Sequence, residues 1–167
     1  MSFSLLPRYR AEALPELSSQ ALHILGIRLL MLDFDNTIVP YTTDTPTPEM
    51  ECWLQEMLNS DIRICVVSNS KKDRVKRFCN QHGIACITHA KKPFSRGIME
   101  CVNRYGVAKE HCALVGDQIF TDTLGANCAG VTSILVKAID NHNFWLKLRH
   151  VAEMPFIWLS AGRRIRK

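Results

Sequence analysis

The sequence lacks a long uninterrupted apolar run, because its longest apolar stretches have the length of a strand or are broken by charged residues. None is therefore long enough to span a bilayer. The first residues show no basic region, long apolar core or small-residue cleavage site of a secretory signal. No internal repeat or low-complexity segment is present. We expect one cytoplasmic domain over residues 1–167, with a core at about 28–136, an N-terminal arm at 1–27 and a basic C-terminal segment at 137–167.

Paired cysteine motifs are also missing. The seven cysteines are odd in number and form no Cys-x-x-Cys pair; they are Cys52, Cys65, Cys79, Cys86, Cys101, Cys112 and Cys128. Most fall on apolar stripes, which favours reduced cysteines packed as small hydrophobic residues over a disulfide framework or a metal site. The histidines lack the spacing of metal ligands, so no zinc site is assigned.

Residues 1–136 carry no excess of charge of either sign, with fourteen basic and fourteen acidic side chains. Residues 137–167 hold seven basic and two acidic side chains, so this segment accounts for the whole net charge of +5. A basic end of this kind can contact an anionic surface of lipid or RNA. The alternative, a solvated tail without a partner, is equally compatible with the sequence.

Strand-like and helix-like segments alternate along the chain. Five short apolar runs predict buried strands at 28–33, 63–67, 84–87, 112–115 and 132–136. Helices are predicted at about 48–59, 71–82, 96–105 and 121–129, with Thr47 and Ser95 as N-caps and Gly83, Gly106 and Gly130 as C-terminal stops. Helices between strands imply parallel pairing with right-handed crossovers. The predicted fold class is an α/β three-layer sandwich around a parallel five-stranded, Rossmann-like sheet.

Polar clusters follow four of these strands, and ligands bind at the carboxyl ends of strands in such sheets. The first cluster is Asp33-Phe34-Asp35-Asn36-Thr37. If strand geometry continues, Asp33 and Asp35 point the same way and repel each other unless a hard divalent cation lies between them. Asp33 can then attack phosphorus, while Asp35 donates a proton to the leaving oxygen and later activates water. Taken alone, an Asp-x-Asp pair also fits capping or turn residues.

Two further clusters carry groups that suit a phosphate. Ser68 and Asn69 follow the second predicted strand, where a hydroxyl and the next backbone N–H can hold a phosphate oxygen. Taken alone, an ordinary helix N-cap explains them better. Lys92, in Lys91-Lys92-Pro93, can neutralise the phosphate and the attacking carboxylate, although solvated charge is the usual explanation of a lysine pair.

The fourth cluster is Gly116-Asp117-Gln118, with Asp122 four residues beyond Gln118. Asp117 is placed to complete an oxygen-rich Mg²⁺ site, and Asp122 can hold a metal-bound water or orient the lysine. Asp122 also suits the first turn of a helix, whose dipole favours a negative charge there. Four such clusters, in order and each after a strand, make coincidence a poor explanation.

With these motifs, residues 28–136 resemble the haloacid dehalogenase-like phosphatases. The resemblance implies a Mg²⁺-dependent phosphomonoester hydrolase that forms an aspartyl-phosphate intermediate. It implies Asp33 as nucleophile; Asp35 as acid/base; Thr37, Ser68, Asn69 and Lys92 as phosphate ligands; Asp33, the Asp35 carbonyl and Asp117 as metal ligands; and Asp122 in support. Lys91 is a rival to Lys92, and the Lys-Pro pairing favours Lys92. The aspartate two residues after the nucleophile favours phosphoester chemistry over dehalogenation, because an alkoxide leaving group needs a proton.

The intervals between motifs leave no room for the cap domain that many of these proteins carry, because a helix and a strand use up 38–67 and 70–90. An open site favours large substrates or completion by a partner chain, and the loop at 40–48 can form a partial rim. Finer details resemble the subclass IIIA group of YqeG-like proteins and mitochondrial-type phosphatidylglycerophosphate phosphatases. That likeness implies phosphatidylglycerophosphate as substrate and phosphatidylglycerol as product. A soluble phosphoester or a phosphoprotein is the alternative substrate.

The C-terminal segment combines aromatic and basic residues, as interfacial helices do. For 144–151 we favour packing on the sheet, whereas 156–159 is left open between packing and contact with a membrane or a partner. Such contact would place the protein peripherally at the inner face of the membrane. A function of another class is an RNA- or ribosome-associated binding protein that uses the basic end. No RNA-binding motif is recognisable, so nucleic acid is not the expected partner, and the sequence leaves the oligomeric state open.

Overall fold

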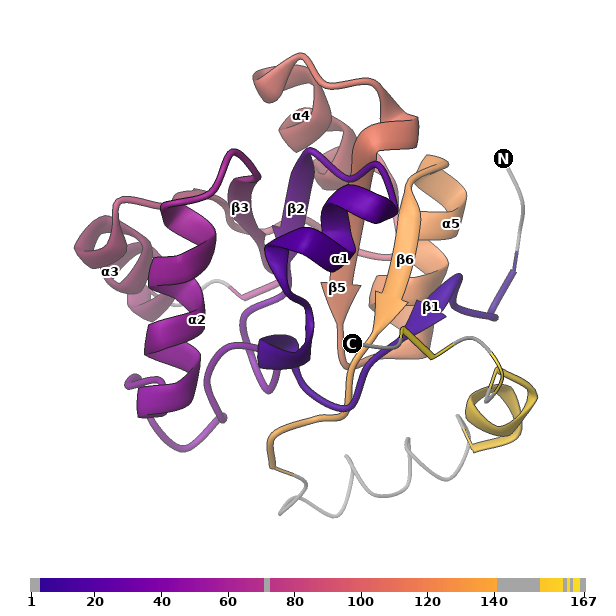
Figure 1. Cartoon of the computed structure of the whole chain (residues 1–167), viewed down its shortest axis with the longest axis horizontal. Helices are drawn as coiled ribbons and strands as arrows, with labels where there is room; N and C mark the ends of the chain where they lie inside the picture. Colours follow the sequence, from indigo (N-terminus) through magenta and orange to yellow (C-terminus); the bar gives the residue numbers. More distant parts are fainter. Residues whose placement is uncertain (1–3, 71–72, 141–153, 161, 163, 166–167) are drawn as a thin grey trace.

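The computed structural model describes residues 4–70, 73–140, 154–160, 162 and 164–165 (Figure 1). The elements in chain order are β1 (Tyr9–Arg10), η1 (Leu14–Glu16), α1 (Ser19–Ile24), β2 (Leu29–Leu32), α2 (Pro48–Leu58), β3 (Arg63–Val67), α3 (Asp73–His82), β4 (Ala85–Ile87), α4 (Arg96–Tyr105), η2 (Lys109–His111), β5 (Cys112–Gly116), η3 (Ile119–Thr123), α5 (Leu124–Ala129) and β6 (Thr132–Leu135). Residues 154–159 form a further short helix.

The strands form one parallel sheet in the order β1-β6-β5-β2-β3-β4. β2 lies at the centre, where Leu29 is opposite Cys112 of β5 on one side and Arg63 of β3 on the other. All five predicted strands are present. The predicted number was wrong by one, because β1 also joins the sheet beside β6. A strand of two residues carries no periodic pattern, so its position depends on its partner.

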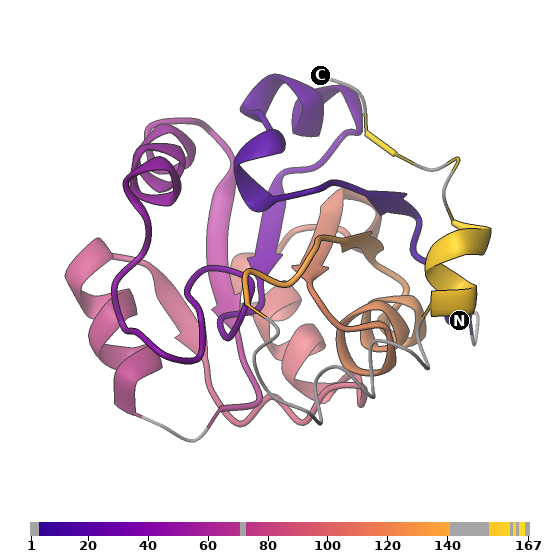
Figure 2. The same ribbon diagram turned by 90° about the horizontal axis from the view of Figure 1, so that it is seen from below.

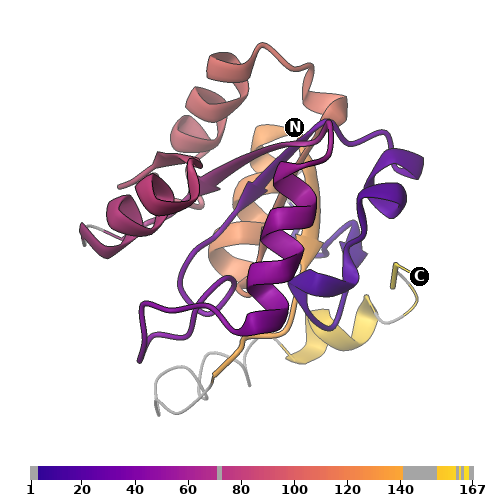
Figure 3. The same ribbon diagram turned by 60° about the vertical axis from the view of Figure 1, so that its left-hand side comes forward.

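Helices cover both faces of the sheet and complete the predicted three-layer sandwich (Figure 3). Successive side chains of a strand point to opposite faces. Leu30 and Leu32 therefore pack with η1 and the helices α1, α2 and α3, whereas Leu29 and Met31 pack with α4 and α5. All four residues of β2 are buried, as expected for a parallel strand covered on both sides.

The helix ends follow capping chemistry in most places. The Thr47 hydroxyl accepts a hydrogen bond from the backbone N–H of Met50, as predicted, and Pro48 opens α2. Gly106 and Gly130 end α4 and α5 in the left-handed conformation that favours glycine. The prediction of Ser95 as an N-cap was wrong, because Ser95 already has helical backbone angles and its side chain accepts no capping hydrogen bond.

Two segments depart from the predicted elements. The sequence predicted one helix over 121–129, but the chain forms the π-helical turn η3 before α5 begins at Leu124. The helix α1 was not predicted, since six residues with Leu22 as the only buried one are too few for an amphipathic pattern. Ser18 caps α1 by accepting a hydrogen bond from the Ala21 N–H.

The described part of the C-terminal segment returns to the N-terminal arm. Arg164 lies beside Arg10 in a parallel bridge, and the Ile165 N–H donates to the Arg10 carbonyl at 2.8 Å. The Arg164 guanidinium lies 3.4 Å from a Glu12 oxygen and 3.6 Å from a Glu16 oxygen. Arg164 is therefore paired with acidic groups of the same chain.

The helix at residues 154–159 is anchored by one ring contact, between Phe156 and Phe120 of η3, with centroids 6.4 Å apart. The Arg10 guanidinium also donates to the Ile157 carbonyl at 2.9 Å. The predicted packing of residues 144–151 lies outside the described residues. No helix within the described ranges has both the length and the apolar character needed to cross a membrane.

Candidate active site

The four predicted polar clusters meet at one edge of the sheet, where four neighbouring strands end. Asp33 follows β2, Ser68 follows β3, Asp117 follows β5, and Lys92 lies in the connection from β4 to α4. Figure 2 looks onto this edge, toward which the strand arrows of Figure 1 point. The strand order β5-β2-β3-β4 brings together residues as far apart in the chain as Asp33 and Asp122, which are separated by 89 positions. These groups can therefore act on one ligand at this edge.

A buried lysine lies at the centre of the site. The Lys92 Nζ atom is 2.5 Å from Oδ1 of Asp33 and 2.7 Å from Oδ1 of Asp122. All three side chains are almost completely buried, so the ion pairs are little screened by water. Lys91 is exposed. Lys92 and not Lys91 therefore lies beside Asp33, and its role toward phosphate stays a prediction.

The backbone of Lys92 is held by the loop that follows β3. The Asn69 side chain donates to the Lys92 carbonyl at 2.9 Å and accepts from the Lys92 N–H at 2.7 Å. The Ser68 hydroxyl, which is buried, accepts from the Ser70 N–H at 3.0 Å. Both ends of the Asn69 amide thus position the lysine, and the roles of Ser68 and Asn69 toward phosphate stay predictions.

Asp122 is fixed from two directions. One carboxylate oxygen contacts Lys92, and the other accepts a hydrogen bond from the Gln118 N–H at 3.1 Å. Gly116 leaves the space that this carboxylate occupies, since a Cβ atom there would lie 2.3 Å from Cγ and Oδ2 of Asp122. The glycine at the end of β5 is therefore required for close packing against Asp122.

Three buried carboxylates gather around the lysine. Oxygen atoms of Asp33, Asp117 and Asp122 lie within 4.8 Å of one another. One ammonium group cannot balance three carboxylates in a buried site, and carboxylate oxygens are the ligands that hard divalent cations prefer. The donor set therefore fits a divalent cation. Both oxygens of Asp122 are engaged, one by Lys92 and the other by the Gln118 N–H, and the roles of Asp33 and Asp117 as metal ligands stay predictions.

The pKa values of Asp33 and of Lys92 are both raised, which favours the neutral form of the carboxyl and the charged form of the lysine. Burial raises the pKa of Asp33 to about 7, against the lowering effect of the adjacent Lys92 charge, and the negative charge of Asp122 adds to the rise. Burial works against the charged form of Lys92, but Asp122 and Asp33 together hold its pKa above the usual value. The site thus favours positive charge beside Asp33.

Asp35 pairs with Arg74, a residue that was not predicted from the sequence to belong to the site. Its Oδ1 atom lies 3.4 Å from Nη1 of Arg74, and it is not part of the three-carboxylate cluster. Arg74 is buried on α3, on the face that also buries Phe78. The sequence held one signal that Arg74 faces inward: it stands four residues before Phe78, in a helix that begins beside the site. The Asp35 carbonyl as a metal ligand stays a prediction.

The turn after Asp35 closes tightly. The Asn36 N–H donates to the Val39 carbonyl at 2.7 Å, and the Asn36 side chain donates to the Asp140 carbonyl at 2.8 Å. Thr37 is buried, and its hydroxyl has no hydrogen-bond partner within the described part of the chain. The predicted phosphate-binding role of Thr37 is not tested by these contacts.

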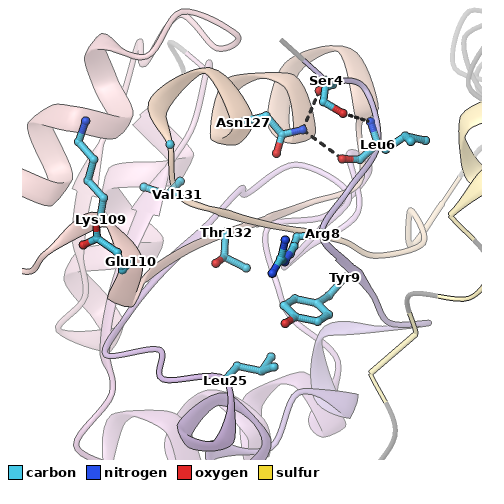
Figure 4. A pocket seen from close by; sticks show the side chains of 11 residues that line it. Ser4, Leu6, Arg8, Tyr9, Leu25, Lys109, Glu110, Asn127, Val131 and Thr132 are labelled. Carbon is cyan, nitrogen blue, oxygen red and sulfur yellow. Dashed lines mark hydrogen bonds between the residues drawn. The ribbon is translucent and has the colours of Figure 1, made fainter. Parts of the chain in front are cut away.

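A separate hollow of about 490 Å³ lies near the opposite edge of the sheet (Figure 4). Its wall includes the N-terminal arm, where the Asn127 side chain donates to the carbonyls of Ser4 and Leu6 at 2.6 and 3.1 Å. Lys109 and Glu110, of opposite charge, both line it. The hollow lies at the amino end of β6 and shares no residue with the site around Lys92.

The family model described as haloacid dehalogenase-like hydrolase matches residues 8–130, which is most of the chain. The chain therefore belongs to the haloacid dehalogenase-like hydrolases, and its parallel sheet with acidic groups at the carboxyl ends agrees with the predicted resemblance.

One particular relative is "Probable phosphatase YqeG" of Bacillus subtilis (strain 168), which is 36% identical over 111 residues. The match covers 66% of this chain and 64% of the relative, so it spans less than two thirds of that protein.

Solved structures of low sequence identity share the fold. A cobalt-bound deoxy-D-mannose-octulosonate 8-phosphate phosphatase from Haemophilus influenzae is 14% identical with a TM-score of 0.53, over 85% of this chain and 92% of that one. A 3-deoxy-D-manno-octulosonate 8-phosphate phosphatase from Moraxella catarrhalis, in complex with a magnesium ion, a phosphate ion and a KDO molecule, is 18% identical with a TM-score of 0.51, over 86% of this chain and 98% of that one.

Proposed function

We propose that this chain is a Mg²⁺-dependent phosphomonoester hydrolase that works through an aspartyl-phosphate intermediate. One observation carries the proposal: Lys92 contacts Asp33 at 2.5 Å within a buried cluster of three carboxylates. A fixed ammonium beside a carboxylate can hold a phosphate next to that carboxylate and offset its negative charge. Membership of the hydrolase family and the likeness to YqeG support the same reaction class.

In the first half of the proposed reaction, an Asp33 oxygen attacks phosphorus. The bond between phosphorus and the ester oxygen breaks, and Asp35 gives its proton to the departing oxygen. In the second half, the ionised Asp35 takes a proton from a water molecule, whose oxygen attacks the same phosphorus. The bond from phosphorus to Asp33 then breaks, and inorganic phosphate leaves.

Lys92 holds the phosphoryl oxygens throughout this sequence, and Asp122 keeps the lysine in place. A cation held by Asp33, the Asp35 carbonyl and Asp117 supplies positive charge that offsets the charge of the phosphoryl group. Thr37, Ser68 and Asn69 lie in the loops that surround this position and complete the proposed phosphate site.

The mechanism is tested by Asp33→Asn, with Asp61→Asn as the matched control because Asp61 is exposed and lies at the other edge of the sheet, before β3. Hydrolysis of p-nitrophenyl phosphate in the presence of Mg²⁺ should disappear in the Asp33 variant only. Acid-quenched wild-type protein should carry a hydroxylamine-sensitive phosphoryl group. Full activity of Asp33→Asn would exclude the mechanism.

We further propose phosphatidylglycerophosphate as the favoured substrate, hydrolysed at a membrane surface. Large exposed apolar side chains accompany the catalytic edge. Tyr41, Phe94 and Ile139 lie in connections that leave the carboxyl ends of strands, and Trp158 and Leu159 are 79% and 62% exposed on the helix that packs on Phe120. Figure 1 places this helix at the end of the molecule to which the strands point. Exposed apolar side chains grouped on one side suit contact with lipid.

The substrate proposal is tested by comparing vesicle-bound phosphatidylglycerophosphate with soluble phosphoesters and a phosphopeptide, each with and without Mg²⁺. The double variant Trp158→Ser, Leu159→Ser should lower turnover of the vesicle-bound lipid while p-nitrophenyl phosphate turnover stays unchanged. Replacing the exposed Leu58, which lies at the far end of α2, serves as control. Preference for a soluble phosphoester or the phosphopeptide would refute the lipid and favour the alternative substrates.

A further inference from the structure

Arg74 is a buried cation in the first turn of α3, and its polar contacts within the described residues are with the segment that follows Asp33. Nη1 donates to the Tyr41 carbonyl at 3.2 Å, and Nη2 donates to the carbonyls of Pro40 and Thr43 at 3.1 and 2.6 Å. Nη1 also lies 3.4 Å from Oδ1 of Asp35. One side chain therefore joins the start of α3 to the loop between β2 and α2.

Each guanidinium nitrogen lies close to an oxygen atom of residues 35–44. Nη1 and Nη2 are engaged as described, and Nε lies 2.9 Å from Oδ1 of Asp44. Its Cζ atom lies over the Phe34 ring, 5.2 Å from the ring centroid. Phe34 stands between the two aspartates of the first motif, so Arg74 packs against that motif on one side and pairs with Asp35 at its edge.

We propose that Arg74 is a positioning residue, which holds the Asp35 side chain and the loop at residues 40–44 in the orientation needed for proton transfer. This inference rests on the proposed function, in which Asp35 is the acid/base. General acid catalysis depends on geometry, because the acid must lie within hydrogen-bond reach of the departing oxygen. An arginine that binds three carbonyls and a carboxylate at once removes the freedom of both the loop and Asp35.

Lysine cannot replace this arrangement. A planar guanidinium with five donors can contact several carbonyls in fixed directions, whereas a single ammonium acts as a point charge with three donors. The variants Arg74→Lys and Arg74→Met therefore separate charge from geometry. Arg77 supplies the matched control, since it lies three residues further along α3 and pairs with Asp44 at 3.4 Å, but it is exposed and makes no contact with Asp35 among the interactions of the described residues.

The discriminating measurement is kcat/KM for two substrates with different leaving groups. p-Nitrophenolate leaves without a proton, whereas the alkoxide of glycerol phosphate needs one from Asp35. Arg74→Met should lower kcat/KM for glycerol phosphate at least about tenfold more than for p-nitrophenyl phosphate, which is part of the roughly 100- to 10,000-fold that a general acid contributes. Arg74→Lys should show the same selective loss, and Arg77→Met should change neither value.

A loss that is equal for both substrates would overturn the proposal, because it would show a structural effect alone. Unchanged kinetics of both Arg74 variants would also overturn it. Arg74→Lys keeps the charge and decides the question if Arg74→Met does not fold, as judged by thermal unfolding. Failure of the proposed function has a different signature, namely wild-type protein that hydrolyses neither substrate or Asp33→Asn that retains activity.

Discussion

Replacing Gly116 by alanine should disable the site without touching a charged residue. The new Cβ would lie 2.3 Å from Cγ and Oδ2 of Asp122 and 2.6 Å from its Cβ. Non-bonded carbon atoms prefer about 3.5–4.0 Å, so a displacement of about 1 Å is required. Asp122 cannot yield freely, because Lys92 and the Gln118 N–H hold its two oxygens.

The expected magnitude follows from two effects. Overpacking costs about 1–3 kcal/mol, and loss of a hydrogen bond to a charged group costs about 1.5–3 kcal/mol. The sum of about 2.5–6 kcal/mol is a large part of the roughly 5–15 kcal/mol that stabilises a typical domain. For a chain of this size it lowers Tm by roughly 5–24 °C. A lysine misplaced by about 1 Å lowers the catalytic rate by about 100-fold.

Differential scanning calorimetry and p-nitrophenyl phosphate turnover measure the two effects in the same preparation. Gly162→Ala is the control, because a Cβ at Gly162 meets nothing within 4 Å and should leave both values unchanged. Gly116→Ala protein with wild-type Tm and wild-type turnover would refute the packing argument. A lower Tm with unchanged turnover would separate Asp122 from the positioning of Lys92.

Two further predictions concern the charges of the site. Lys92→Met leaves Asp33 and Asp122 buried without their cation and should lower the free energy of unfolding by about 3–5 kcal/mol, with turnover abolished. The control Lys91→Met should stay within about 0.5 kcal/mol of wild type. Urea titrations measure both values, and a larger loss in the Lys91 variant would contradict the prediction. Because burial raises the pKa of Asp33 from 3.8 to about 7, the metal-free folded state keeps a proton that the unfolded state loses. That contribution to stability is present below about pH 4 and is lost as the pH rises through about 7. Mg²⁺ requires the ionised carboxylates and should raise Tm more at pH 8 than at pH 5, and equal shifts would contradict this assignment.

The sequence predicted those features that have a local cause. β2, β3 and β5 are continuous apolar runs because both faces of the sheet are covered, and such runs are visible without a structure. The order of the polar clusters then predicted where the candidate site lies, since the carboxyl ends of parallel strands meet at one edge of the sheet. The choice between Lys91 and Lys92 followed from the neighbouring Pro93.

Other features depend on contacts between distant segments, and no local pattern announces them. β1 exists only through its pairing with β6. In the sequence, Arg74 resembles a surface residue of a charged helix. It is buried because the loop at residues 40–44 passes over it and accepts its hydrogen bonds with backbone carbonyls. Ser95 has the residue type of a cap, but its backbone is already helical, and its side chain accepts no capping hydrogen bond.

The pairing of β1 with β6 has a consequence for the order of events during synthesis. Arg8, directly before β1, donates its backbone N–H to the Ser133 hydroxyl, 125 residues later. At roughly 5–20 residues per second, the ribosome needs about 6–25 s to supply that partner after Arg8 has been made. The central strands β2, β3 and β5 can associate earlier, because their partners are closer in the chain. The first strand in the sequence is therefore among the last to join the sheet. The N-terminal arm that carries it stays unpaired with β6 while β2, β3 and β5 associate.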